Sequence, residues 1–284
     1  MANACKNKKI YTDLLGDCEK PNIGSFQKTG FIPFDYVTGY TVDASDTTGK
    51  VVTNITRKFK REFFNYKQTA RNSGVLIDNQ EEGDAFPIFT HGFNGLIQAA
   101  DEFAQDNLDR LAGGRTIVVA RDKNQRYKIL GENSGLKLIT KTDQSDNETS
   151  QGLAQLEMST NEENGSARLL RIIDRLTDPQ NPTYDLTATT QVFDTLFEPQ
   201  GLVITGVTVG ATTVFTVAST AEMQEYLDSE GSLDVSFKNF TDTVLSSKLN
   251  GIIPTSATIL SDTTFSVSVN TTGGVLVASD AEVF

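Results

Sequence analysis

The sequence has no tryptophan, one histidine and only two cysteines among 284 residues. Cys5 and Cys18 have no histidine near them, and because a zinc site usually needs four ligands, this pair does not predict one. No secretory signal with an apolar core and a cleavage site is visible at the N-terminus, which favours free thiols over a disulfide. The lone His91 has no serine or cysteine motif beside it, so we expect a packing or capping residue and not a catalytic one.

The motifs of common catalytic and nucleotide-binding sites are also missing. The chain has no phosphate-binding loop, no glycine-rich dinucleotide fingerprint, no nucleophile elbow and no H-E-x-x-H pair. Glu162 and Glu163 are adjacent carboxylates, but a surface charge run explains them better than acid–base chemistry, which needs burial or a charged neighbour. Asp143, Asp146 and Glu148 lack the glycine and the spacing of a calcium loop. The sequence therefore predicts no enzyme, no cofactor and no metal site.

Long hydrophobic runs and an even distribution of charge are absent as well. The longest charge-free stretch, 199–221, is interrupted by three glycines and rich in threonine, which predicts paired strands and not a membrane span. Residues 1–75 carry a net charge of +5 and the rest −17, which together give the −12 of the whole chain. An acidic body argues against binding the DNA backbone, although a like-charged wall would let a polyanion slide past it.

The segment 91–132 carries the clearest periodic pattern. Its apolar residues recur at three- and four-residue steps, which predicts an amphipathic helix over about 95–112 that ends at Gly113 and Gly114. The β-branched run Thr116–Ala120, a polar turn and the run 127–130 then predict a hairpin. The apolar helix positions are Leu96, Ala99, Ala100, Phe103, Leu108 and Leu111.

Residues 30–85 read as strands, and within them the stretch 57–67 alternates basic and aromatic residues. Three interpretations stay open for it. It could be a platform for single-stranded nucleic acid, or a basic surface that docks on the acidic surface of a neighbouring copy. The third, which we favour, is a strand with Phe59 and Phe63 in a core and the basic side chains on its other face. The candidates for contacts between subunits are Arg57, Lys58, Lys60 and Arg61, which cluster on this one expected strand.

The composition changes near Phe197, after which threonine, serine, valine and glycine dominate. Two similar runs, 212–217 and 263–267, each place a phenylalanine and a valine among threonines or serines, and 221–227 suits a short helix between them. Many short strands with frequent turns are typical of a β-sandwich of immunoglobulin-like kind. We therefore expect two domains, 1–197 and 198–284.

The helix and hairpin, with Leu111-Ala-Gly-Gly-Arg115 between them and 127–136 after them, resemble the major tail proteins that form the tail tube of long-tailed bacteriophages. The resemblance implies a mainly β fold: two packed antiparallel sheets with one flanking α-helix, followed by the C-terminal immunoglobulin-like β-sandwich. It also implies a virion protein, assembled in the host cytoplasm, whose hexameric rings stack into a tube through which genomic DNA passes without specific binding. The implied partners are further copies of the chain and other tail proteins.

We expect the body to form rings through sheet edges, with the C-terminal domain decorating the outside and the connections 43–50 and 140–152 ordering only on assembly. Two alternatives stay open. One is another virion part, such as a head–tail connector or a decoration protein. The other is a carbohydrate- or surface-binding β-module, which the absence of tryptophan from the C-terminal segment, and the presence there of Tyr226 as its only tyrosine, disfavour.

Overall fold

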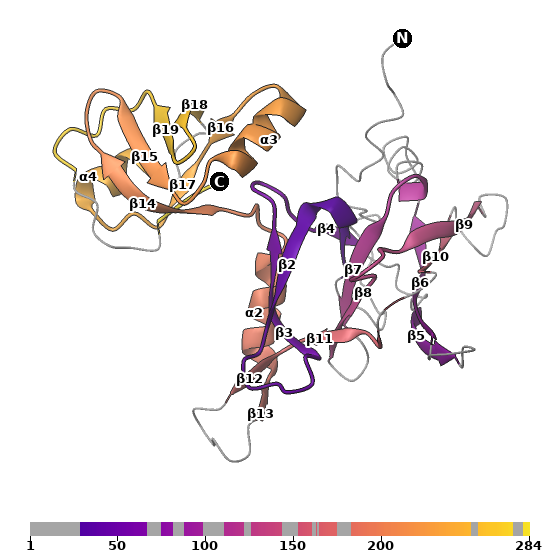
Figure 1. Ribbon diagram of the computed structural model, residues 1–284. Coiled ribbons are helices and arrows are strands. Elements are labelled where there is room, and N and C mark those ends of the chain that lie inside the picture. Colours follow the sequence, from indigo (N-terminus) through magenta and orange to yellow (C-terminus); the bar gives the residue numbers. More distant parts are fainter. Residues whose placement is uncertain are drawn as a thin grey trace, which may run out of the picture. The chain divides into compact units, whose positions relative to one another are not determined.

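The computed structural model describes residues 29–66, 75–81, 88–98, 111–121, 126–143, 153–160, 163, 165–174, 183–250, 255–274 and 281–284. It is mainly β, with several antiparallel sheets (Figure 1). The chain divides into two compact units, and the second unit comprises Arg57–Arg61 together with Pro199–Phe284. The first, N-terminal unit contains the remaining residues up to Glu198. The division thus falls one residue beyond the predicted one and also assigns five residues from the N-terminal half to the C-terminal unit.

A seven-stranded central sheet organises the N-terminal unit. Its pairs are antiparallel except for one parallel pair, β11 with β3. The 3-10 turn η1 (Phe34–Tyr36) joins its strands β1 and β2. β7 is buried along almost its whole length, as expected for a β-branched strand covered on both faces. The strands, in spatial order, are β2 (Val37–Val42), β3 (Val51–Arg57), β11 (Arg168–Leu170), β8 (Tyr127–Leu130), β7 (Thr116–Arg121), β1 (Thr29–Pro33) and β4 (Phe64–Tyr66).

A four-stranded antiparallel sheet packs on one face of the central sheet, and α2 (Leu186–Thr195) packs on the other face (Figure 1). Phe31 on β1 meets Phe93 on β6 edge to face, 5.3 Å between ring centroids, inside the core between the two sheets. Phe193 on α2 packs on Tyr127 of β8 in the second core, 4.6 Å between centroids. The four strands, in order, are β5 (Val75–Glu81), β6 (Ile88–Gln98), β10 (Leu153–Ser159) and β9 (Lys137–Asp143), and a separate ladder joins β12 (Ile172–Asp174) to β13 (Thr183–Asp185).

The hairpin predicted after the glycine pair is confirmed, because β7 and β8 pair with Val118 opposite Leu130. The predicted start of the helix at 95 is wrong. β6 continues as a strand to Gln98 and pairs with β10 over its last seven residues, so hydrogen bonds between strands override the helical spacing of the side chains. Residues 99–110 lie outside the described part of the chain, whereas residues 111–112 are helical and lead into the glycine pair.

The C-terminal unit has one seven-stranded sheet, and a single short segment of the chain supplies the strands at both of its ends. Val235 pairs with β18, and Phe237, two residues later, pairs with β20 at the other end of the sheet. The residues 234–238 therefore close the sheet around its core. The elements are β14 (Leu202–Thr208), β15 (Thr213–Val217), α3 (Ala221–Glu230), β16 (Asp234–Val235), β17 (Phe237–Lys238), α4 (Thr243–Leu249), β18 (Thr255–Ser261), β19 (Thr264–Val267) and β20 (Glu282–Val283).

The two similar runs found in the sequence are neighbouring strands of this sheet. Phe215 on β15 lies directly opposite Phe265 on β19, and the two rings stack with 5.2 Å between centroids. Phe237 stacks on Phe215 at 4.6 Å, which completes an aromatic core. The short helix expected at 221–227 is confirmed as α3, whereas α4 was not predicted from the sequence. Within the described residues, no helix is long and apolar enough to cross a membrane.

Candidate interaction surfaces

The basic residues Arg57–Arg61, here called the basic turn, do not lie on one strand as the sequence predicted. β3 ends at Arg57, and Lys60 adopts a left-handed backbone conformation with a φ of 58°. The N–H of Lys60 donates to the carbonyl of Gln200 at 2.9 Å, and the N–H of Gln200 donates to the carbonyl of Arg61 at 3.2 Å. These hydrogen bonds replace a sheet partner and bend the chain, which explains why alternation alone gave the wrong element.

Phe59 anchors the basic turn in the core of the C-terminal unit. Its side chain is buried and meets Tyr226 of α3 edge to face, with 6.0 Å between centroids. Its backbone N–H donates to the carboxylate of Glu222 at 2.8 Å. Phe63, four residues on, is buried in the N-terminal unit instead. Both phenylalanines are thus core residues, as the favoured interpretation expected, but they belong to different cores.

The charged side chains of the basic turn meet acidic residues of α3 in the same chain. Lys58 forms an ion pair with Glu225 at 2.7 Å, and Arg61 forms one with Glu230 at 3.0 Å. Lys60 and Arg61 also lie over the ring of Tyr226, 5.1 and 5.0 Å from its centroid.

Burial lowers the pKa of Lys60, although Asp234 opposes that shift. Burial, and after it Glu230, raise the pKa of the Tyr226 hydroxyl. The acidic surface expected on a neighbouring copy therefore has a counterpart within the chain, while contact between subunits stays a prediction for Arg57, Lys58, Lys60 and Arg61.

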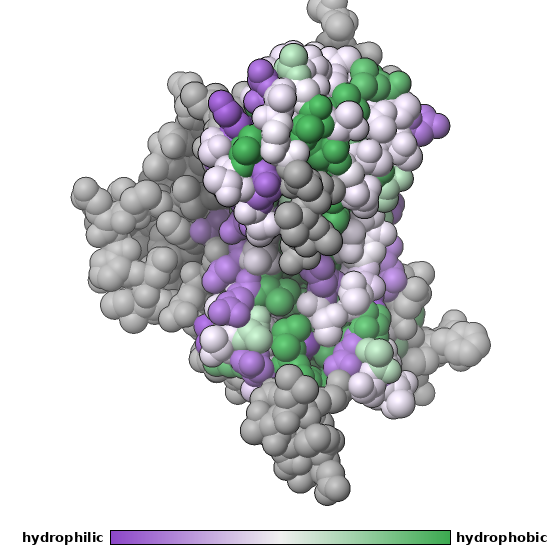
Figure 2. Space-filling view, turned by 90° about the vertical axis from the view of Figure 1, so that its left-hand side faces the viewer, coloured by the Kyte–Doolittle hydropathy of each residue, from purple (hydrophilic) through white to green (hydrophobic). Residues whose placement is uncertain are grey.

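The edges of the two sheets in the N-terminal unit form a second candidate surface. Among the described strands, β5 and β9 are the edges of the four-stranded sheet, and β2 and β4 are the edges of the central sheet. Sheet edges present unpaired N–H and C=O groups to which a further strand can be added. Ile139 on β9 is 62% exposed, the largest value among the exposed large hydrophobic residues of the described chain. Figure 2 shows that hydrophobic residues reach the surface between hydrophilic ones on one face of the molecule.

A polar cluster joins the two sheets inside the N-terminal unit. His91 lies within β6 and not before a helix, and it is buried. Its Nε2 lies 3.0 Å from the carbonyl of Gly165, and its Nδ1 accepts the N–H of Gly131 at 3.3 Å. These two contacts define the neutral tautomer with the proton on Nε2. Burial lowers the pKa of His91, against the opposing influence of Glu163 and Asp78. A packing role for His91 is therefore what the geometry supports.

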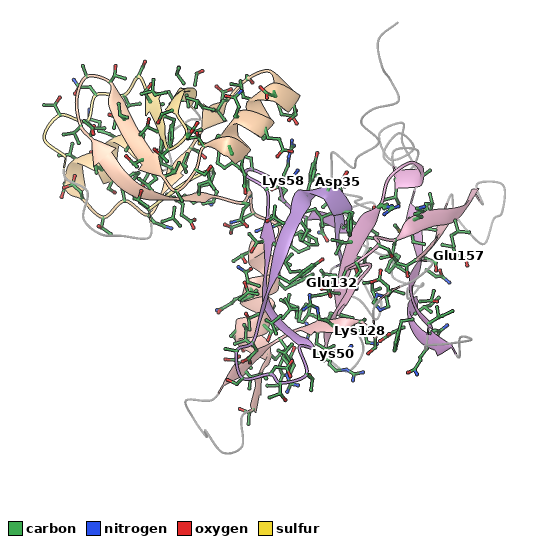
Figure 3. The ribbon with its side chains drawn as sticks, in the orientation of Figure 1. Asp35, Lys50, Lys58, Lys128, Glu132 and Glu157 are labelled. Atoms are coloured by element: carbon green, nitrogen blue, oxygen red, sulfur yellow. The ribbon has the colours of Figure 1, made fainter. Side chains whose placement is uncertain are left out.

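Glu163 is buried, so the prediction of a surface charge run is wrong for this residue. Its carboxylate accepts four hydrogen bonds, from the backbone and side chain of Asn133 and of Ser134, at 2.8 to 3.2 Å. Nearby, Asp78 accepts a hydrogen bond from Lys128 at 3.3 Å, and Arg168 forms an ion pair with Glu132. Figure 3 labels Lys128, on β8, and Glu132, which lies just after β8. The cluster satisfies its own charges and holds the layers together.

In the described parts of the chain no group of histidine, cysteine and carboxylate side chains is arranged to hold a metal ion. Asp143 is the last residue of β9, while Asp146, Glu148, Glu162, Cys5 and Cys18 lie outside the described residues.

The connection 43–50, expected to order only on assembly, is a compact turn in the single chain. The carboxylate of Asp46 accepts hydrogen bonds from the hydroxyl and N–H of Thr48 and from the N–H of Val51, at 2.6 to 3.0 Å. The hydroxyl of Thr48 and these N–H groups lower the pKa of Asp46 to about 2. The expectation for this connection is therefore wrong. Of the connection 140–152, residues 140–143 belong to β9 and the rest lie outside the described residues.

No known family model matches the sequence, no curated protein is detectably similar to it, and no solved structure matches the fold.

Proposed function

We propose that this chain is a structural virion protein whose copies join edge to edge into rings, and that the rings stack into a phage tail tube through which DNA passes. The observation that carries the proposal is the direction of the edge strands. Every neighbouring pair in the four-stranded sheet is antiparallel, so β5 and β9 at its two edges run in opposite directions. β9 of one copy can therefore continue the sheet of the next copy by antiparallel pairing with its β5.

Such a contact joins two different surfaces, and repeating it head to tail closes a ring when the rotation between copies divides a full turn. The sequences of the two edges suit one another, because β9 contains Lys137 and Lys141 while β5 ends at Glu81. An exposed Ile139 on β9 adds apolar surface that pairing would cover.

The C-terminal unit fits the role of an attached domain outside the ring contacts. The terminal strands of its sheet, β16 and β17, have two residues each and come from one segment, which leaves little length for strand addition. We propose that this unit is immunoglobulin-like, because it has short antiparallel strands and an aromatic core. In this proposal α3, α4 and the segment 234–238 are additions to a simple β-sandwich. The net charge of −12 suits DNA passage without DNA binding.

Negative-stain electron microscopy of the purified, concentrated protein tests the proposal directly. Stacked rings or tubes are expected, whereas rings that never stack would indicate a head–tail connector, and monomers at every concentration would refute ring formation. Ile139→Lys should suppress assembly because it places a charge on the pairing edge. The matched control is Leu260→Lys, at a similarly exposed strand position (55%) in the sheet of the C-terminal unit, which should assemble normally. The wild type should show no salt-sensitive DNA binding.

A further inference from the structure

The central sheet has one edge that lacks the usual protection against strand addition. β4 is only three residues long, β5 contains Asp78 and Glu81, and β9 carries two lysines and an aspartate. β2, with the sequence VTGYTV, has six residues with no charge and no proline, and Val42 at its end is exposed. Proteins use short length, charge and proline to limit strand addition; the charges of β5 and β9 are already used in the proposed ring contact, so β2 is the remaining edge of full length that is open to a partner strand.

The backbone of β2 is oriented to receive such a strand. The N–H of Asp43, which follows β2, donates to the carbonyl of Val51 at the start of β3. In an antiparallel pair every second residue directs its N–H and C=O to the same neighbour. The backbone groups of Thr38, Tyr40 and Val42 are therefore directed away from β3, toward the open side.

The strand directions at the two edges of the central sheet also suit antiparallel pairing between copies. β2 and β3 form a hairpin across the short connection 43–50, β3 is parallel to β11, and each later pair out to β4 is antiparallel. Following these pairs across the sheet, β2 and β4 run in opposite directions. β4 of one copy can therefore pair antiparallel with β2 of another.

The edges of the two sheets lie on corresponding sides of the N-terminal unit. On one side, Asp78 of β5 accepts hydrogen bonds from Lys128 of β8 and from the N–H of Ala167 just before β11. Phe93 of β6, the next strand of the four-stranded sheet, meets Phe31 of β1, so the order β5-β6-β10-β9 runs in the same direction as the order from β11 to β4 in the central sheet. A copy that adds its β9 to β5 thus approaches with its β4 on the side where β2 is open. Since the central sheet has seven strands against four, it would form the wider, outer wall.

We propose that β2 binds β4 of a second copy of this chain, so that the central sheet also continues from subunit to subunit. This proposal rests on the proposed ring, to which it adds a second contact. Hydrogen–deuterium exchange of the full-length protein, below and above the concentration at which it assembles, separates the two. The β5–β9 contact predicts slower exchange at 75–81 and 137–143, and the β2–β4 contact predicts slower exchange at 37–42 and 64–66.

Protection at 75–81 and 137–143 alone would overturn this inference and leave the proposed ring intact. Protection at 37–42 in a discrete dimer, without 64–66, would instead mean that β2 pairs with β2, which refutes both the β2–β4 contact and the ring. A protein that never assembles refutes both contacts.

Thr38→Pro removes an outward N–H at an exposed edge position and should weaken assembly about tenfold or more, while Thr38→Ala should not. If the proline variant fails to fold, Thr38→Lys replaces it as a charged block on the same edge. Assembly of folded Thr38→Pro or Thr38→Lys at the wild-type concentration would contradict the proposal.

Discussion

The two units of this chain solve the problem of sheet edges in opposite ways. In the C-terminal unit the segment 234–238 pairs with both ends of the sheet, and the terminal strands β16 and β17 have only two residues each. In the N-terminal unit both sheets end in strands whose outer sides have no partner strand among the described residues. Short terminal strands leave little length for strand addition, whereas longer open edges invite it. The difference supports the proposal that association is the role of the N-terminal unit.

The cores differ as well. None of the residues of β14, β15, β18 and β19 is charged, and these strands pack around stacked phenylalanines. In the N-terminal unit a buried histidine and a buried glutamate lie between the layers, each held by hydrogen bonds. Directional hydrogen bonds fix how two layers are placed, while apolar packing mainly sets how stable a layer is. We expect the two cores to respond to different perturbations.

The largest effect is expected at Phe59, which among the described residues is the one core residue of the C-terminal unit that comes from the N-terminal half. Phe59→Ala removes a buried ring and should lower the free energy of unfolding of that unit by about 3–5 kcal/mol. Urea unfolding followed by hydrogen exchange at 213–217 and 264–267 measures it. Lys58→Ala, at the neighbouring and only partly buried position, serves as control and should cost under about 1 kcal/mol. Equal effects of the two variants would show that the C-terminal unit folds without this residue.

Phe59 also affects the design of a variant that lacks the C-terminal unit. Because the C-terminal domain is expected to decorate the outside of the ring, deleting Gly201–Phe284 should leave tube formation intact. The deletion also uncovers Phe59, and an exposed phenylalanine beside four basic residues would promote aggregation. Combining the deletion with Phe59→Ser should therefore restore soluble protein that still assembles. If the combined variant is soluble but stays monomeric, the C-terminal unit is part of the ring and the proposed division of roles fails.

A second large effect is expected at Glu163, the buried carboxylate of the polar cluster in the N-terminal unit. Glu163→Ala leaves the donors of Asn133 and Ser134 without their acceptor and should cost roughly 3 kcal/mol. Glu163→Gln keeps one acceptor oxygen and should lose less. Glu157, exposed on β10, provides the control, and Glu157→Ala should be nearly neutral. Thermal unfolding of the three variants ranks them, and a neutral Glu163→Ala would show that the cluster does not hold the layers.

Local patterns predicted the hairpin β7–β8 and the short helix α3, because each depends on residues close together in sequence. The similarity of the two phenylalanine-containing runs was also visible, because it depends on composition alone. The helix at 95–112 failed at Leu96 and Ile97, whose backbones pair with β10, more than fifty residues later in the chain. The burial of Glu163 depends in the same way on Asn133 and Ser134. The open edges are properties of strand order, which no single segment encodes. Long-range pairing thus decided where sequence reasoning failed.

The buried histidine should make the N-terminal unit sensitive to acid. The pKa of His91 lies below its ordinary 6.5, because burial disfavours the charged form more than Glu163 and Asp78 favour it, and Lys128 opposes it too. As pH falls through about 6.5, His91 becomes protonated in the unfolded chain while it stays neutral in the folded chain. Stability is therefore full above that pH and declines below it, by up to about 1.4 kcal/mol per pH unit.

Protonation would also place an N–H on Nδ1 against the N–H of Gly131, so the turn at Gly131 should open first. Urea unfolding at pH 7.5, 6.5 and 5.5 measures the decline. His91→Asn should be less stable at neutral pH but should lose this part of the pH dependence. An identical decline in the variant would assign it to other groups.

The smallest effect on stability, and the sharpest test of the basic turn, comes from its ion pairs. Reversing Lys58 and Arg61 to Glu sets like charges against Glu225 and Glu230. Because these pairs are partly exposed, the loss in stability should be about 1 kcal/mol or less. Reversing Glu225 and Glu230 to Lys in the same chain should restore stability, since the pairs are re-formed with opposite sign.

Assembly of this fourfold variant, followed by sedimentation, then separates the two roles open for the side chains of Lys58 and Arg61. If they pair only within the chain, the fourfold variant assembles like the wild type. If they also contact a neighbouring copy, the fourfold variant is stable but assembles poorly, because the neighbour's acidic surface then meets carboxylates on the basic turn where the wild type presents Lys58 and Arg61.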